Sequence, residues 1–257
     1  MKKRINQYCF LLAFVTLVLP VRAQEERSAE VIRSSLIGLE YRAKAGFNLG
    51  GTAPMPMPAE IRSIESYNPT LAFAIEGDVT KWLNNRFGLI TGIRLESKGM
   101  KTDAMVKSYQ MEMVSKEEGA LKGVWTGSVK TQTRSAFFTV PLLATWKYNN
   151  RLQLELGGYY SLLIDGQFSG TAYDGYLRKG DPTGEKVLVS EAAYDFSDYL
   201  RNNHFGLEMG AEWRAFTHLN IYSDFTWGLN NIFEDDFKSI SFAMYPIYLN
   251  VGFAYLF

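Results

Sequence analysis

The sequence has little of three features that would assign it to common classes of protein. It contains one cysteine, Cys9, in 257 residues, which excludes a disulfide framework and a thiolate metal centre. Basic and acidic residues number 27 each, and this balance argues against a nucleic-acid partner, which selects for a basic excess. Hydrophobic residues make up 47% of the chain and the mean hydropathy is −0.12. These values exclude both a bundle of membrane helices and a disordered chain.

A long apolar run is present only at the N-terminus. Three basic residues at positions 2–4 precede the apolar stretch 8–21, and Val21-Arg22-Ala23 places small residues at the two positions that a signal peptidase reads. This order is typical of a secretory signal peptide. The stretch is also too short to span a bilayer as a helix, which requires roughly 20 residues. We therefore predict a signal peptide over residues 1–23, cleaved between Ala23 and Gln24.

The rest of the chain alternates between apolar and polar residues with period two. In the segment 39–49 every odd-numbered residue is apolar, whereas Glu40, Arg42 and Lys44 lie between them. Alternation of this kind is typical of strands that have one apolar and one polar face. It predicts an all-β fold with eight strands, at 39–49, 71–79, 87–98, 138–146, 152–162, 205–214, 219–227 and 247–257.

The connections between these strands alternate in length. Turns at 83–86, 148–151 and 216–218 are short, and the first two contain pairs of asparagines, which tolerate the left-handed backbone of tight hairpins. The other connections are expected to be long loops, at 51–68, 99–134, 166–203 and 230–239. Short turns on one rim and long loops on the other are typical of an antiparallel, up-and-down transmembrane β-barrel of the outer membrane. We therefore predict a periplasmic segment over residues 24–37 and a barrel domain over 38–257, with both termini periplasmic.

The apolar face of such a barrel faces either lipid or an enclosed ligand. Lipid is favoured because aromatic residues gather near the strand ends, as interfacial girdles require. Tyr255 and Phe257 in the last strand are also expected to form the signal that barrel-insertion machinery reads. The polar face then fills the lumen, since eight strands leave just enough room for side chains. We predict a lumen charge network of Arg42, Lys44, Glu76, Asp78, Arg94, Glu96, Lys98, Glu155, Glu208, Glu212, Arg214 and Asp224.

Several short stretches resemble one known family. These are the Lys98-Gly99 pair at the end of the third strand, Val140-Pro141-Leu142-Leu143, Gly157-Gly158-Tyr159-Tyr160, Phe205-Gly206-Leu207-Glu208 and Trp227-Gly228-Leu229-Asn230. They are similar to strands of the PorT-type outer-membrane β-barrel family of Bacteroidetes, and the resemblance covers residues 38–257. Asn203-His204 departs from the family, which more often has an acid before the sixth strand. The resemblance implies a barrel of this type and no catalytic residues.

The sequence offers little for catalysis or cofactor binding. His204 and His218 are the two histidines. In a regular strand His204 and Glu208 lie about 13 Å apart at roughly 3.3 Å per residue, too far for a hydrogen bond. No phosphate-binding loop, nucleophile elbow or Cys/His metal cluster is present. The triplet 234–236 could attract calcium but fits better as a solvated acidic loop. We therefore predict no enzymatic activity, no metal and no cofactor.

The remaining expectation is a structural or surface-binding role at the cell envelope. Outer-membrane lipid and the insertion machinery are the predicted partners, with no nucleic acid. The loops 99–134 and 166–203 are the predicted contact surface for an extracellular ligand or protein. Their aromatic residues could serve recognition or pack on each other, and include Tyr109, Trp125, Tyr173, Tyr176, Tyr194, Phe196 and Tyr199. A small transporter or gated channel, a secretion-accessory barrel, a lipid-modifying envelope enzyme and a soluble exported ligand-binding barrel remain as alternatives.

Overall fold

The computed structural model describes residues 38–115, 119–237, 239, 240 and 242–257. The chain divides into two units, residues 1–39 and 40–257, and the second is described here by itself. The predicted signal peptide, its cleavage position and the segment 24–37 lie outside the described residues. Within the described ranges, no helix is long and apolar enough to cross a membrane.

The described chain consists almost entirely of antiparallel strands. One short 3₁₀ helix, η1 (Ser197–Tyr199), interrupts them. The strands are β1 (Leu39–Pro54), β2 (Ile61–Pro69), β3 (Ala72–Trp82), β4 (Phe87–Ser115), β5 (Gly119–Lys147), β6 (Leu152–Lys179), β7 (Lys186–Asp195), β8 (Asn203–Arg214), β9 (Leu219–Gly228) and β10 (Met244–Leu256).

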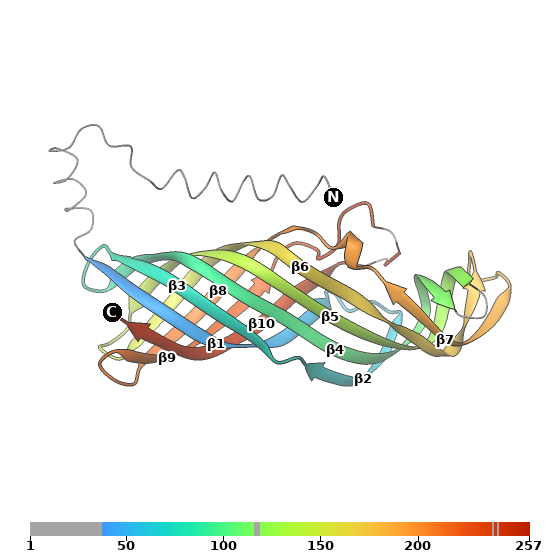
Figure 1. Cartoon of the computed structure of the whole chain (residues 1–257), viewed down its shortest axis with the longest axis horizontal. Coiled ribbons are helices and arrows are strands. Elements are labelled where there is room, and N and C mark those ends of the chain that lie inside the picture. Colours follow the sequence, from blue (N-terminus) through green and yellow to red (C-terminus); the bar gives the residue numbers. More distant parts are fainter. Residues whose placement is uncertain (1–37, 116–118, 238, 241) are drawn as a thin grey trace, which may run out of the picture. The chain divides into compact units, whose positions relative to one another are not determined.

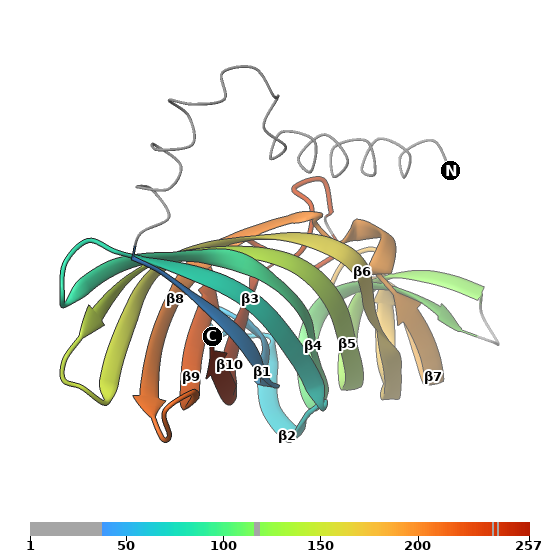
Figure 2. The ribbon, with the colours of Figure 1, turned by 60° about the vertical axis from the view of Figure 1, so that its left-hand side comes forward.

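Eight of these strands close into a ring. The pairing runs β4-β3-β1-β10-β9-β8-β6-β5, and β5 pairs back onto β4. Figures 1 and 2 show these strands tilted around a common axis, with the C-terminus at the end where the short turns lie. Each of the eight predicted strands lies largely within one ring strand, so the all-β antiparallel barrel is confirmed.

The short turns are stabilised by their asparagines. The Asn84 side-chain oxygen accepts hydrogen bonds from the backbone amides of Arg86 and Phe87, each at 2.8 Å. The Asn149 oxygen accepts from the amides of Arg151 and Leu152, at 2.7 and 2.8 Å. Each asparagine thus replaces backbone partners that a tight turn leaves unpaired.

The expectation of long loops at 99–134 and 166–203 was wrong. Strands β4 and β5 are 29 residues long and β6 is 28, whereas a strand needs only about 9–11 residues to cross a bilayer. More than half of each strand therefore continues beyond the span. These continuations, with β2 and β7, form a β-sheet extension at the long-loop end (Figure 1).

A bulge explains why the period-two pattern missed the extension. On β4, even-numbered residues such as Arg94 and Lys98 face inward, but above the register shift between Val106 and Tyr109 the odd-numbered Tyr109, Met111 and Met113 do. Ser108 lies in the shift, with φ of 57°. An extra residue in one strand reverses which face each later residue occupies, so one continuous alternation cannot describe the strand.

The extension closes on itself as well. Strand β7 pairs with β6 along the length of β7. Near the tip of the extension, β7 also pairs with β4, at Val114↔Ala193 and Ser115↔Ala192. Since β4 pairs with β5 and β5 with β6, the strands β4, β5, β6 and β7 form a second, smaller ring. Figure 1 shows β7 at the end of the molecule opposite the C-terminus.

Candidate functional site

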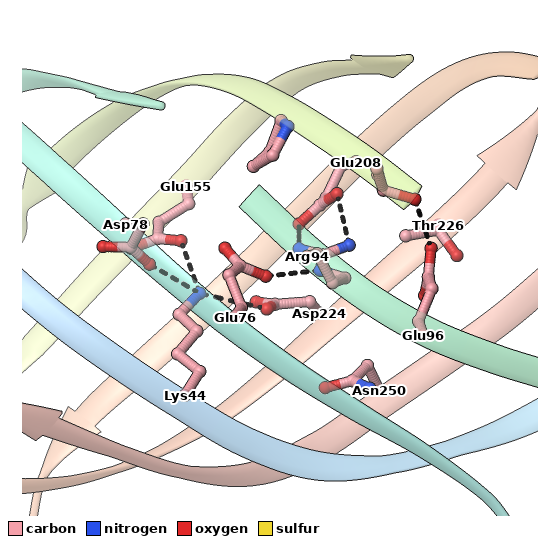
Figure 3. A network of polar contacts seen from close by, with 12 residues as sticks. Lys44, Glu76, Asp78, Arg94, Glu96, Glu155, Glu208, Asp224, Thr226 and Asn250 are labelled. Atoms are coloured by element: carbon pink, nitrogen blue, oxygen red, sulfur yellow. Dashed lines mark hydrogen bonds and ion pairs between the residues drawn. The ribbon is translucent and has the colours of Figure 1, made fainter. Parts of the chain in front are cut away.

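The interior of the eight-stranded ring is filled with charged side chains. The structure buries eleven of the twelve residues predicted for the lumen. Arg214 is the exception, because it is the last residue of β8, at the short-turn rim, where its side chain is exposed to solvent. Figure 3 shows the central part of this lumen charge network, with side chains from strands on opposite sides of the ring pointing toward one another.

The cluster nearest the short turns is built around two cations of β1. Arg42 donates hydrogen bonds to Asp78 at 2.8 Å, to Glu155 at 2.9 Å and to Glu212 at 2.5 Å. The Lys44 ammonium lies 3.2 Å from the Asp224 carboxylate, 3.5 Å from Glu155 and 4.0 Å from Asp78.

These contacts of β1 reach carboxylates on four other strands. The acids come from β3, β6, β8 and β9, so Arg42 and Lys44 tie opposite walls of the ring together. Charged pairs this deeply buried are stable only when hydrogen bonds satisfy them.

The middle cluster is centred on Arg94 of β4. Its guanidinium donates to Glu208 of β8 through two nitrogens, at 3.0 and 2.5 Å, and to Glu76 of the neighbouring strand β3. This forked geometry suits a carboxylate and fixes its orientation. Arg94 therefore crosses the lumen and joins walls that lie far apart in the sequence.

The cluster nearest the extension is a single ion pair in an aromatic surround. Lys98 donates to Glu96 at 3.0 Å. The rings of Phe137, Tyr159 and Tyr248 lie 5.4–5.6 Å from the Lys98 ammonium, a distance at which aromatic faces attract a cation.

Neutral polar residues complete the network, although none of them was among the predicted lumen residues. Thr139 donates to Glu96 at 2.9 Å and shares a hydrogen bond with Ser161 at 2.7 Å. Asn250 donates to Asn48 at 2.7 Å, and Asn220 donates to Glu212. All five lie on the polar face of predicted strands, so strand parity alone could have identified them.

A small cavity separates the charged network from the extension. It has a volume of about 20 Å³ and is lined by residues that include Lys98, Thr133, His204 and Tyr248, which is room for about one water molecule. His204 is buried, with one ring nitrogen 2.9 Å from the Arg201 carbonyl. Glu208, the carboxylate considered as its partner in the sequence, binds Arg94 instead.

An apolar core fills the extension above this cavity. Trp125 is fully buried, and Phe168, Phe196, Phe233 and Phe237 pack with ring centroids 4.6–6.3 Å apart. Thus several aromatics predicted as possible recognition residues pack on other residues of the chain. Tyr109, Trp125, Tyr194 and Phe196 are buried, Tyr173 and Tyr176 are half-buried, and Tyr199 is 47% exposed.

Burial also sets the chemistry of two tyrosines in this core. Burial raises the pKa of the Tyr109 and Tyr194 hydroxyls well above the ordinary value, so both stay neutral. The Tyr194 hydroxyl donates to the Lys130 carbonyl at 2.9 Å and lies 2.6 Å from the Thr131 hydroxyl. The Tyr194 hydroxyl is therefore hydrogen-bonded within the core, whereas the buried Trp125 indole nitrogen has no hydrogen-bond partner among the described residues.

The outer surface of the extension is held by polar contacts. The Tyr173 hydroxyl donates to the Asp103 carboxylate at 2.9 Å, and this bond raises the pKa of the tyrosine. Lys130 lies 4.5 Å from the Tyr173 ring and 3.9 Å from Asp103. Because these residues come from β4, β5 and β6, the contacts fix the outer faces of three strands.

The outward face of the ring is apolar. On β8 Phe205, Leu207 and Met209 are each more than 50% exposed. The proposed insertion signal lies on the same surface, where Tyr255 is 48% and Phe257 78% exposed and their rings lie 5.2 Å apart. A polar interior and an apolar exterior are the reverse of a water-soluble barrel.

The chain matches a known family of proteins. The model described as "Outer membrane protein beta-barrel domain" matches residues 22–234. Comparison with curated proteins finds no significant match.

Three solved structures give weak likenesses. Ail, the attachment invasion locus protein of Yersinia pestis, has 10% identity and a TM-score of 0.39, over 86% of this chain and 100% of that chain. Neisserial surface protein A has 10% identity and a TM-score of 0.29, over 86% and 97%. The outer membrane protease OmpT from Escherichia coli has 12% identity and a TM-score of 0.34, over 85% and 96%. At these values the likenesses decide nothing about function.

Proposed function

The chain belongs to the outer membrane protein beta-barrel domain family, and from this premise we propose that it is a non-conducting surface protein. Its barrel anchors the chain in the outer membrane, and its β-sheet extension presents a rigid binding surface for an extracellular ligand or protein. The observation that carries this proposal is the combination of a filled lumen with ring strands that continue far beyond the membrane span.

The filled lumen argues against the alternative of a transporter or gated channel. Arg42, Lys44 and Arg94 each contact carboxylates from at least two other strands. A permeation path would have to break these ion pairs, and removing one partner of a buried pair costs about 3–5 kcal/mol. The apolar core of the extension adds a second barrier above the network.

The extension is built as a stable surface. From Arg134 to Gly119 strand β5 continues for about 50 Å at roughly 3.3 Å per residue, and its core is closed by the second ring of strands. A loop that only connected strands would not need a core of its own. A rigid surface of this kind loses little conformational entropy when it binds a partner.

Several finer assignments belong to the same proposal. The short turns and the C-terminus face the periplasm, and the extension faces outward. Lipid and the insertion machinery, which reads Tyr255 and Phe257, are the partners of the barrel itself. A relationship to PorT-type barrels fits the strand motifs, and the chain is proposed to have no catalytic activity.

A shortened variant tests the proposal. Asn-Gly turns replace residues 107–126 and 172–192, which keeps the observed pairs Val106↔Gly127 and Thr171↔Ala193 as the last rungs. We expect this variant to reach the outer membrane and migrate faster when unboiled, as a folded barrel does. We also expect it to lose partners that crosslink to the intact protein at the cell surface.

Conductance separates the alternatives. The intact protein is expected to give no steady conductance in a planar bilayer. Steady conductance of the intact protein would favour the channel.

A shortened variant that keeps every surface crosslink would overturn the role of the extension. An epitope inserted at 181–184 should be accessible on intact cells, and protection of that epitope would overturn the proposed orientation.

A further inference from the structure

The lumen charge network is not neutral. Its buried cations are Arg42, Lys44, Arg94 and Lys98, four in number among the described residues. Its buried carboxylates are seven, Glu76, Asp78, Glu96, Glu155, Glu208, Glu212 and Asp224. The described interior therefore carries a formal excess of three negative charges, and an isolated buried charge is too costly to remain uncompensated.

The excess is concentrated near the short turns. Lys98 balances Glu96, whereas Arg94 serves two acids. Arg42 and Lys44 together serve four, namely Asp78, Glu155, Glu212 and Asp224. Two of the three surplus charges thus belong to the cluster around β1.

Unpartnered oxygens point into this cluster. One carboxylate oxygen on each of Glu76, Asp78 and Glu155 is buried and accepts no hydrogen bond from a described residue. Figure 3 shows these side chains converging on the region around Lys44. Lys44 is the ion-pair partner of two of them, at 3.5 Å from Glu155 and 4.0 Å from Asp78, distances too long for a good hydrogen bond.

The geometry favours a proton over a metal ion as the missing positive charge. Within the described ranges, no group of three or more Asp, Glu, His or Cys side chains is arranged to hold a metal ion. The Lys44 ammonium itself occupies the position between the carboxylates (Figure 3). A proton needs no additional space and converts an acceptor oxygen into a donor.

We propose that this cluster is a proton-binding site, in which the carboxylates of Asp78, Glu155 and Asp224 around Lys44 hold at least one proton between them at neutral pH. Asp224 is the main carrier of this proton, because Lys44 is the one ion-pair partner of Asp224 among the described residues. Asp78 and Glu155 also bind Arg42. The inference rests on the closed lumen of the proposed function.

Other groups in the lumen set the charge that Asp224 meets. They come from every strand packed around it: Arg42 and Lys44 on β1, Glu76 and Asp78 on β3, Arg94 on β4, Glu155 on β6, Glu208 and Glu212 on β8, and Tyr222 on β9. The Tyr222 ring lies 4.9 Å from the Lys44 ammonium. On β10 the residue paired with Asp224 is the neutral Asn250, and Tyr248 lies two positions away, beside Lys98.

Infrared spectroscopy of the mature chain, refolded in lipid vesicles, tests the inference. At neutral pH we expect a carbonyl band of a protonated carboxylic acid that shifts in deuterated water and is lost in Asp224→Asn. The matched control is Glu185→Gln in the extension, whose side chain is 73% exposed, and this variant should keep the band.

Unfolding gives a second readout. The folded barrel holds a proton that the unfolded chain releases, so its stability should fall as the pH rises from neutral to alkaline. Asp224→Asn should flatten this dependence, because its amide has no proton to lose. If this variant does not fold, Asp78→Asn replaces it in both measurements and should likewise weaken the band.

Two results would overturn the inference. One is a wild-type spectrum with no protonated carboxyl at neutral pH. The other is a metal ion present in stoichiometric amounts whose removal by a chelator destabilises the barrel. Either result in a barrel that does not conduct would leave the proposed function standing, whereas steady conductance would reject the closed lumen itself.

Discussion

Arg94 and Glu208 bind each other across the lumen through a two-pronged hydrogen bond, with nitrogen–oxygen distances of 3.0 and 2.5 Å. The residues are 114 positions apart in the sequence and lie on β4 and β8. Both side chains are almost completely buried. Their contact links opposite walls of the ring and also neutralises buried charge, so closure of the ring and neutralisation of its interior depend on the same pair.

Removing this cation should be costly. Arg94→Met leaves the carboxylates of Glu76 and Glu208 without their shared partner, and breaking a buried ion pair destabilises by about 3–5 kcal/mol. The urea midpoint of the barrel in detergent should fall accordingly. Adding Glu76→Gln and Glu208→Gln to the same variant should restore most of the loss. Equal stability of the single and triple variants would contradict this role of Arg94.

The outward face of β8 should reject charge. Met209 is 57% exposed and pairs with Leu156 and Phe225, which lie on the same outward face. Met209→Arg should destabilise the barrel in lipid vesicles by about 2–4 kcal/mol, the cost of arginine near the bilayer midplane. The control Leu188→Arg lies in the extension, 74% exposed, and should be neutral. If both variants unfold alike, this face does not meet lipid.

The extension should lose its structure without loss of the barrel. Trp125 is fully buried in its apolar core, and Trp→Ala changes in cores cost about 3–5 kcal/mol. Trp125→Ala should make the extension sensitive to limited proteolysis while the barrel still migrates faster unboiled. Leu188→Ala, at an exposed position, should stay resistant. Loss of the fast-migrating form in Trp125→Ala would show that the two parts fold as one unit.

The terminal aromatics should govern assembly more than stability. Tyr255 and Phe257 are exposed on the outward face at the short-turn end, so their removal deletes few internal contacts. The double variant Tyr255→Ala, Phe257→Ala should slow appearance of the folded form in cells, measured by pulse-chase and heat-shift electrophoresis. Phe216→Ala, 70% exposed in a turn, is the matched control and should assemble at the normal rate.

The strands of the ring were predictable because lipid and lumen impose opposite preferences on alternate residues. In β1 the buried Arg42, Lys44 and Asn48 alternate with the exposed Tyr41, Phe47 and Leu49. The structure buries eleven of the twelve charged residues that this parity predicted for the lumen. Arg214 departed from it because burial depends on height in the barrel as well as on parity.

The extension was not predictable in the same way. The bulge at Ser108 exchanges the inner and outer faces of β4, and the alternation that resumes at Tyr109 is therefore out of phase with that at Arg94. Aromatics such as Trp125 lie in a polar stretch of the sequence, where exposed side chains are expected. Their burial depends on residues of β6 and β7, such as Leu177 and Val189, that lie more than 40 positions from Trp125 in the sequence.

The sequence by itself determined the ring, its short turns and the polarity of its two faces, because each follows from the side-chain period of a strand. The tertiary structure decided which cation binds which carboxylate, how many acids share one partner, and that the stretches predicted as loops are strands around an apolar core. These properties depend on strand register and on ring closure, which set distances between residues that no local pattern relates.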